Sequence, residues 1–234
     1  MTARAGVITF PGSNGDHDAF SALNDNLGVD TKLVDYRETT LDGLDLIVVP
    51  GGFSYGDHLR CGAIARFAPV VTALADFAGR GGPVLGICNG FQILTEAHLL
   101  PGALLRNKSL QFHCEWVGVR VETNRTAWTS GIVSGSLLRL PVAHGEGAYF
   151  ADDETLDRVE ANGQVVFRYC DPKGKSNALA NFNGSARGIA GISNERGNVV
   201  GLMPHPERAC DSLLGGVDGV RVFESALVAL SVAV

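Results

Sequence analysis

The sequence predicts an α/β protein built on an open, mostly parallel β-sheet with helices on both faces and added antiparallel strands in its second half. Three observations support this fold class. Short apolar segments alternate with helical segments in the first half, which is the order that builds a parallel sheet. These apolar segments are continuous, as expected for strands buried on both faces. The second half holds further strand-like segments, and the 234 residues include 30 glycines, enough for many tight turns.

The elements of the first half follow a β-α-β-α-β order. Asp16 stands at the expected start of the first helix and is a suitable N-cap. Pro50-Gly51-Gly52 ends the third apolar segment. Together these elements predict the flavodoxin-like part of the sheet. They are a strand at Ala5–Phe10, a helix at Asp16–Leu27, strands at Thr31–Asp35 and Leu44–Val49, a helix at Cys61–Phe77 and a strand at Pro83–Ile87.

The second half is richer in strands. Residues 194–197 have the composition of a turn, so we expect the segments on either side to pair as a hairpin. No Pro/Ser-rich linker and no internal repeat divides the sequence, so we expect residues 1–234 to form a single domain. The predicted elements are strands at Trp116–Val121, Leu138–Ala143, Val165–Tyr169, Gly188–Ser193 and Asn198–Met203, and an amphipathic helix at Val220–Val234.

Composition argues against several classes of function. A formal net charge of −6 disfavours a broad binding surface for nucleic acid or for an anionic membrane. The N-terminus lacks the long apolar segment of a signal peptide, and the apolar C-terminal segment is too short to cross a bilayer. The five cysteines form no CxxC pair, which favours reduced thiols in a cytoplasmic protein.

A cysteine between two glycines is the strongest candidate for chemistry. Residues 84–92 read as an apolar strand that turns sharply into a helix, with Cys88 at the turn. Gly86 and Gly90 leave room for a strained backbone that exposes the sulfur as a nucleophile. The N-terminus of the following helix favours the thiolate. Taken alone, a cysteine after an apolar strand is more often an ordinary core residue.

Two backbone amides are candidates for an oxyanion hole. Ligand sites in open parallel sheets lie beyond the carboxyl ends of the strands. Gly52 follows the predicted strand that ends at Val49, and Asn89 follows Cys88 at the start of a helix. If the two strands are near neighbours, the N–H groups of Gly52 and Asn89 can both face the sulfur and stabilise a tetrahedral intermediate.

A histidine with a carboxylate two residues later supplies a candidate base and its orienting group. Pro204 and Pro206 disfavour helical geometry at the residues before them, so we expect an extended segment. Residues two apart in an extended chain point to the same side, which brings His205 and Glu207 together. Cysteine, histidine and glutamate then form the nucleophile, base and orienter of acyl transfer. A His-x-Glu pair by itself is usually a surface pair.

The sequence predicts neither a nucleotide site nor a metal site. Gly174-Lys175-Ser176 is like the end of a P-loop, but Tyr169 occupies the place of the required earlier glycine. His144-Gly145-Glu146-Gly147 does not complete a GxGxxG motif. His113 lacks metal-ligand spacing with other histidines or cysteines.

The Cys88 and His205 motifs together resemble the class I, triad-type glutamine amidotransferases. Within that class, further segments resemble one family, the glutaminase subunits of phosphoribosylformylglycinamidine synthase, which acts in de novo purine synthesis. The resemblance covers nearly the whole chain. Its segments are Phe10-Pro11-Gly12-Ser13-Asn14, Gly51-Gly52-Phe53-Ser54-Tyr55-Gly56-Asp57, Gly86-Ile87-Cys88-Asn89-Gly90-Phe91-Gln92, Asn107-Lys108-Ser109, Phe112-His113-Cys114-Glu115-Trp116, His144-Gly145-Glu146-Gly147 and Asn183-Gly184-Ser185.

The resemblance implies that the chain hydrolyses the side-chain amide of L-glutamine to glutamate and ammonia through a cysteine thioester. It assigns a role to each motif residue. The implied residues are Cys88 as nucleophile, Gly52 and Asn89 as oxyanion donors, His205 as proton donor and base, Glu207 as its orienter, and Gln92, His144, Gly145 and Glu146 as the glutamine pocket.

The resemblance also implies partners. Forming an amidine from an amide requires activation of the acceptor oxygen, and the sequence shows no ATP site. By resemblance, a separate large synthetase subunit uses ATP and Mg and receives the ammonia to convert formylglycinamide ribonucleotide to formylglycinamidine ribonucleotide. A small accessory subunit completes the complex. We expect no cofactor and no metal in this chain itself.

One position departs from the family pattern, and two alternatives stay open. Phe182 stands where the family usually has proline, so loop 181–185 loses a fixed φ. One alternative is an amidotransferase subunit of another synthetase, such as one forming guanylate or anthranilate, although those relatives differ at residues 144–147. The other is a non-catalytic regulatory module, which tends to lose the nucleophile or the His-x-Glu pair that this chain keeps.

Overall fold

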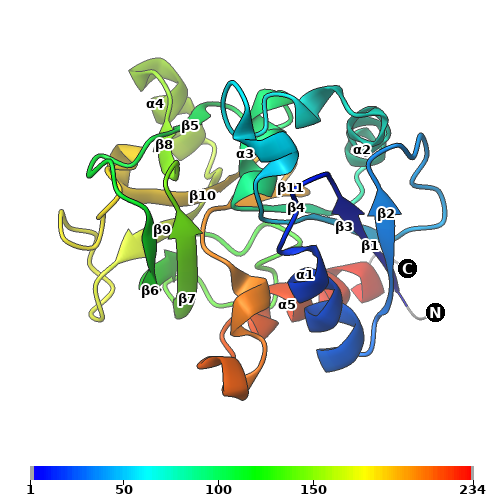
Figure 1. Ribbon diagram of the computed structural model, residues 1–234. Coiled ribbons are helices and arrows are strands. Elements are labelled where there is room, and N and C mark those ends of the chain that lie inside the picture. The colour runs from blue at the N-terminus through cyan, green and yellow to red at the C-terminus, as the bar shows by residue number, and fades with distance from the viewer. Residues whose placement is uncertain (1–2, 233–234) are drawn as a thin grey trace.

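The computed structural model describes residues 3–232 and contains a nine-stranded sheet in the order β2-β1-β3-β4-β11-β10-β9-β6-β7 (Figure 1). Strands β5 and β8 form a separate two-stranded sheet. The strands are β1 (Arg4–Thr9), β2 (Asp30–Asp35), β3 (Leu46–Val49), β4 (Val84–Ile87), β5 (Ala103–Leu105), β6 (His113–Val121), β7 (Leu137–His144), β8 (Ala148–Phe150), β9 (Val165–Cys170), β10 (Ile189–Ser193) and β11 (Val199–Leu202). The helices are α1 (Asp16–Ser21), α2 (Pro69–Gly79), α3 (Asn89–Glu96), α4 (Asp153–Ala161) and α5 (Val220–Val232).

Strands β2, β1, β3, β4 and β11 form the parallel half of the sheet. Every residue of β3, β4 and β11 is buried. Burial is this complete because α1 and α5 cover one face of the sheet while α2 and α3 cover the other (Figure 1). The predicted α/β class, with a mostly parallel sheet between two helical layers, is confirmed.

The other half of the sheet is antiparallel. The predicted hairpin is confirmed, since β10 pairs antiparallel with β11. Strands β9, β6 and β7 continue the sheet from β10 with antiparallel pairing throughout. The added antiparallel strands of the second half are therefore confirmed. Strands β5 and β8 were not predicted, because three residues each are too short to establish a hydrophobic period.

One predicted N-cap and one predicted helix start are wrong. Asp16 is the first residue of α1 rather than its N-cap, which is Gly15. The predicted helix over Cys61–Phe77 begins only at Pro69, after a 3-10 turn at Ala65–Phe67. Proline suits the first turn of a helix, and it forces the preceding Ala68 into an extended conformation with a ψ of 142°. A helix cannot run through that residue.

Of the remaining helical segments, two agree closely with expectation and one was not predicted. The first helix continues beyond α1 as a π-helical segment over Ala22–Asn26, close to the predicted end. Helix α4 was not predicted, although Asp152 caps it by accepting a hydrogen bond from the N–H of Thr155 at 2.7 Å. Helix α5 is present as expected, and the last two residues of its predicted range, 233–234, lie outside the described residues.

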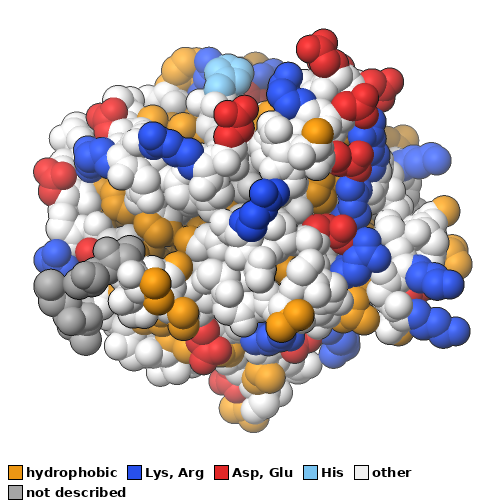
Figure 2. All heavy atoms as spheres, turned by 180° about the vertical axis from the view of Figure 1, so that it is seen from behind, with side chains coloured by type: hydrophobic (Ala, Val, Ile, Leu, Met, Phe, Trp, Pro, Cys, Tyr) orange, Lys and Arg blue, Asp and Glu red, His pale blue; other side chains and the backbone are white. Residues whose placement is uncertain are grey.

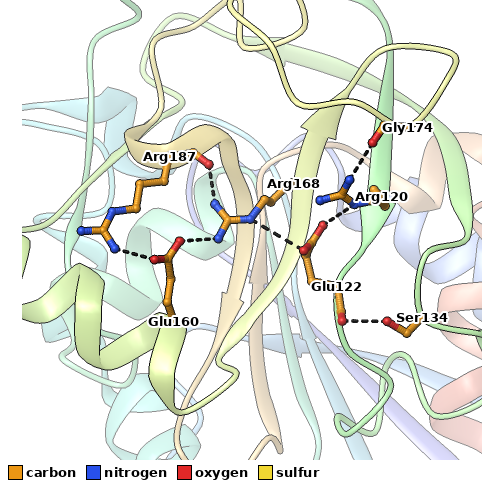
Figure 3. A network of polar contacts seen from close by, with 7 residues as sticks. All are labelled: Arg120, Glu122, Ser134, Glu160, Arg168, Gly174 and Arg187. Carbon is orange, nitrogen blue, oxygen red and sulfur yellow. Dashed lines mark hydrogen bonds and ion pairs between the residues drawn. The ribbon is translucent and has the colours of Figure 1, made fainter.

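A chain of ion pairs crosses the antiparallel half (Figure 3). Glu160 of α4 pairs with Arg187 and with Arg168 of β9, and Arg168 also lies 3.8 Å from Glu122. Arg120 of β6 pairs with Glu122 at 2.6 Å and donates to the carbonyl oxygen of Gly174 at 2.7 Å. Arg168 donates to the carbonyl oxygen of Arg187. The loop between β9 and β10 is therefore held by a hydrogen bond at Gly174 and by the ion pair of Arg187, near both of its ends.

Charged side chains of both signs are interspersed on the face shown in Figure 2. Lysine and arginine adjoin aspartate and glutamate along one side of this view, and no broad area of one sign covers it. This distribution agrees with the modest net charge of −6. The face does not carry the continuous basic patch of a nucleic-acid-binding surface.

The close approach of α3 to β3 generates a stability prediction. A Cβ added at Gly90 would lie 1.9 Å from the carbonyl oxygen of Val49, so Gly90→Ala must push the helix away from the strand. We expect a loss of about 3 kcal/mol in the free energy of unfolding, measured by urea denaturation. Gly79→Ala is the matched control, because a Cβ at Gly79 meets no atom within 4 Å. Equal losses in the two variants would contradict the close approach.

Candidate active site

Three neighbouring parallel strands end at the same edge of the sheet. Strand β4 lies between β3 and β11 and pairs in parallel with both. The strands before Gly52 and Cys88 are therefore neighbours, which is the condition on which the predicted oxyanion hole depends. The chain continues from β3 to Gly52, from β4 to Cys88 and from β11 to His205. Residues far apart in the sequence thus meet beyond the carboxyl ends of these strands.

Cys88 occupies a strained turn between β4 and α3. Its φ of 49° and ψ of −104° lie in a region that residues with a side chain rarely adopt. Its N–H donates to the carbonyl oxygen of Leu202 at 2.8 Å, which ties the turn to β11. The flanking glycines are required, because a Cβ at Gly86 would lie 2.8 Å from the backbone of Gly90. The side chain is 5% exposed.

His205 and Glu207 form a buried pair. Nδ1 of His205 lies 2.6 Å from Oε1 of Glu207, and each residue is 2% exposed. His205 is extended as predicted, but Glu207 lies in the 3-10 turn Pro206–Ala209. The prediction that both residues stand on one extended segment is therefore wrong. The tighter turn brings the carboxylate to the imidazole instead.

His205 and Cys88 lie on either side of Gly51. A Cβ at Gly51 would stand 2.8 Å from Cε1 of His205 and 3.6 Å from the Cβ of Cys88, so only glycine leaves room for both side chains. Nε2 of His205 is buried, with no hydrogen-bond partner of ordinary geometry among the described residues. Burial would lower the pKa of His205, but the charges of Glu207 and Cys88 raise it to about 10. The imidazole is thus held in its protonated form.

The two candidate oxyanion donors, the N–H groups of Gly52 and Asn89, lie beyond the carboxyl ends of the neighbouring strands β3 and β4. Gly52 has a φ of +147°, and a Cβ there would lie 2.7 Å from the Cα of Ser13, so glycine is needed. Its N–H has no acceptor among the described residues. Asn89 is the first residue of α3, where an N–H has no intrahelical acceptor. Both donors remain available to a ligand at Cys88.

A cleft of about 200 Å³ opens beside the sulfur of Cys88. It contains every residue implied for the glutamine pocket, together with five to which the sequence analysis gave no role in the site, namely Phe53, Asp57, Cys61, Phe112 and Ala143. The lining residues are Gly52, Phe53, Asp57, Cys61, Cys88, Gln92, Phe112, Ala143, His144, Gly145 and Glu146.

Hydrogen bonds connect the walls of this cleft. Nε2 of Gln92 donates to the carbonyl oxygen of Glu146 at 2.6 Å, and Asn89 donates to Oε1 of Gln92 at 2.9 Å. The thiol of Cys61 lies 3.1 Å from a carboxylate oxygen of Glu146. Burial and the nearby carboxylates raise the pKa of Cys61, which keeps it a neutral thiol. Burial, with Glu146 nearby, also raises the pKa of Asp57.

Phe182 stands where the family usually has proline, and its ring packs against three other aromatic rings. Its ring centroid lies 4.7 Å from that of His113, 5.3 Å from that of Tyr169 and 5.9 Å from that of His144. The next residue, Asn183, donates to the carbonyl oxygen of Gly147 at 2.9 Å. The loop therefore packs against the segment that lines the cleft, although Phe182 leaves its own φ unrestricted.

Residues 3–232 show neither the side-chain cluster of a metal site nor a helix suited to span a membrane. In that range no three or more histidine, cysteine or acidic side chains cluster as they would around a metal ion. Nor does that range include a helix with the length and apolar content needed to cross a bilayer. All five cysteines are unpaired.

Residues 2–216 match the model of the CobB/CobQ-like glutamine amidotransferase domain, which is the class that the fold and this site define. A phosphoribosylformylglycinamidine synthase subunit PurQ from Thermomicrobium roseum is 63% identical over 231 residues, covering 98% of each chain. The PurQ subunit from Gloeobacter violaceus is 57% identical over 228 residues, covering 97% of this chain and 98% of that one. The chain therefore belongs to the glutamine amidotransferase family of phosphoribosylformylglycinamidine synthase subunits.

A solved structure agrees with this family. The structure of PurLQS from Thermotoga maritima includes a chain that superposes with a TM-score of 0.86 at 47% identity. The superposition covers 98% of this chain and 100% of that one. The curated relatives above favour this family over amidotransferases that serve guanylate or anthranilate formation.

The buried pair generates a prediction about proton binding. In Glu207→Gln the imidazole loses the carboxylate whose charge is the largest cause that raises its pKa, so the pKa of His205 falls from about 10. NMR titration of the His205 ring measures this shift. A raised pKa stabilises the native state fully below pH 6.5, and this contribution is lost as pH rises towards 10. The wild type should therefore lose more stability across that range than the variant does. An unchanged titration in the variant would contradict the pairing.

Proposed function

We propose that the chain hydrolyses the side-chain amide of L-glutamine through a thioester on Cys88 and delivers ammonia to a separate ATP-dependent synthetase subunit. That subunit converts formylglycinamide ribonucleotide to formylglycinamidine ribonucleotide in de novo purine biosynthesis. The observation that carries the proposal is the meeting of Cys88, His205 and Gly52 at the ends of three adjacent parallel strands. The similarity to phosphoribosylformylglycinamidine synthase subunits indicates which synthetase reaction uses the ammonia.

The first half of the reaction forms the thioester. The Cys88 sulfur attacks the carboxamide carbon, and a carbon–sulfur bond forms as the carbonyl oxygen takes up the electron pair. The N–H groups of Gly52 and Asn89 stabilise that negative oxygen. The carbon–nitrogen bond then breaks, and His205 gives its proton to the nitrogen, which leaves as ammonia. The raised pKa of His205 keeps this proton available at neutral pH.

The second half restores the enzyme. His205, now neutral, takes a proton from a water molecule as the water oxygen attacks the thioester carbon. The carbon–sulfur bond breaks and glutamate leaves. The sulfur and His205 then have the protonation states with which the reaction began. Glu207 fixes the orientation of the imidazole through the 2.6 Å contact at Nδ1 in both halves. Each bond change uses a side chain of this chain, so we propose that the glutaminase step needs no cofactor.

The cleft beside Cys88 is the proposed glutamine site. Gln92 supports it by bonding to the backbone of Glu146, and the segment from His144 to Glu146 forms one wall. We propose that residues 1–234 act as one catalytic domain, with the antiparallel half of the sheet building that wall. Unpaired cysteines suit a reducing compartment, so we place the protein in the cytoplasm.

The proposed partners follow from the chemistry and from the relatives. The synthetase subunit binds ATP and Mg and activates the acceptor oxygen. The PurLQS structure from Thermotoga maritima supports an assembly with that large subunit and with a small accessory subunit. L-Glutamine is the substrate of this chain. Neither nucleic acid nor a membrane has a part in the proposed reaction.

Cys88→Ala tests the proposed function directly. The variant lacks the nucleophile, so we expect glutamine-dependent synthesis by the complex to fall by about 10⁴-fold or more. Synthesis from added ammonium salts should persist, because ammonia then bypasses the thioester. Cys170→Ala is the matched control, since Cys170 is also buried but lies in β9 outside the cleft. Retained glutamine-dependent synthesis in Cys88→Ala would refute the assignment of the nucleophile.

A further inference from the structure

Asn107 is fully buried next to the cleft and has no role in the proposed reaction. It lies between β5 and β6, with 0% of its surface exposed. Its backbone N–H donates to the carbonyl oxygen of Gly145 at 2.9 Å. Its side chain faces the segment from His144 to Gly147, part of which forms one wall of the cleft.

The side-chain amide of Asn107 uses its whole hydrogen-bonding capacity. Nδ2 donates to the carbonyl oxygens of Gln111 and His144, both at 2.9 Å. Oδ1 accepts from the N–H of Gly147 at 3.0 Å and contacts Nδ1 of His144 at 3.1 Å. The orientation of the amide is fixed, because carbonyl oxygens can only accept and a backbone N–H can only donate. Oδ1 is therefore an acceptor towards His144.

This orientation determines the tautomer of His144. A nitrogen that contacts an acceptor must carry the hydrogen, so Nδ1 is protonated and Nε2 holds a lone pair. Burial, with His205 and His113 nearby, lowers the pKa of His144 to about 3. The ring is consequently neutral at physiological pH. Nε2 is buried and has no hydrogen-bond partner among residues 3–232.

An unpartnered acceptor at this place points to a ligand. His144 is 3% exposed and lines the same cleft as Cys88. The carbonyl oxygen of the preceding residue, Ala143, lies 3.9 Å from the sulfur. Phe182 stacks on the imidazole with an interplanar angle of 23°, which limits rotation of the ring. The imidazole thus borders the cleft in which the reacting carboxamide must lie.

We propose that Nε2 of His144 accepts a hydrogen bond from an N–H of the carboxamide bound at Cys88, and that Asn107 is the positioning residue that fixes His144 as the required tautomer. The inference rests on the proposed function. Such a bond orients the NH₂ group of the tetrahedral intermediate, so that the nitrogen lone pair faces the proton on His205. His144 itself exchanges no proton, because its Nδ1–H remains bonded to Asn107.

An ester substrate separates this role from a purely structural one. L-Glutamate γ-methyl ester forms the same thioester at Cys88 but releases methanol and has no carboxamide N–H. His144→Phe keeps an aromatic ring and removes the acceptor. With the complete complex, we expect kcat/KM for glutamine to fall about 10- to 30-fold, while kcat/KM for the ester changes less than about 3-fold. His144→Gln, which can place an oxygen near Nε2, should restore most of the loss.

Asn107 requires a readout of its own. In Asn107→Leu the imidazole loses the acceptor at Nδ1, so we expect ¹⁵N shifts of His144 to report a mixture of tautomers. The ratio of amide to ester hydrolysis should fall as in His144→Phe. Asn198→Leu is the matched control. Asn198 is also buried and donates to two carbonyl oxygens, those of Ala78 and Gly82, but it lies at the amino ends of β4 and β11.

The outcomes distinguish a failure of this inference from a failure of the proposed function. Equal losses for amide and ester in His144→Phe, or a single unchanged tautomer in Asn107→Leu, would overturn this inference while leaving the proposed function intact. A wild-type complex that hydrolyses neither substrate would overturn both. A selective loss of amide hydrolysis in both variants, absent from Asn198→Leu, is the expected result.

Discussion

The parallel pairing of β4 with β3 on one side and β11 on the other determines the whole arrangement of the site. It places the ends of three strands side by side, so that the segments containing Gly52, Cys88 and His205 meet. The N–H of Cys88 extends the β4–β11 pairing by one further hydrogen bond, to Leu202. A shift in either register would carry Cys88 away from His205 or from Gly52.

Close packing without side chains is the second requirement at this edge of the sheet. Gly90 lets α3 approach the carbonyl of Val49, and Gly51 lets the imidazole of His205 reach the side of Cys88. A methyl group at either position would occupy the space through which the groups meet. These two glycines are therefore needed because they have no side chain. The need arises only because the strand order brings the surrounding groups so close together.

Much of the parallel half could be predicted, because continuous apolar segments and glycine-rich turns are local signals. The predicted helix Cys61–Phe77 begins eight residues later than expected, because the effect of Pro69 on Ala68 outweighed the helical composition before it. Asn107 could not be assigned a role from sequence, since its partner His144 lies 37 residues away and pairs with it only in the folded chain. The same holds for Asp57 and Cys61, which reach the cleft through a turn with positive φ at Asp57.

The strained backbone at Cys88 has a consequence for how such a protein changes over time. Its φ of 49° suits glycine better than any residue with a Cβ, so the fold by itself favours glycine at this position. Selection for heat resistance alone would thus tend to remove the sulfur. Cysteine at position 88 opposes the preference of the backbone, and under the proposed function its presence reflects selection for turnover rather than for durability.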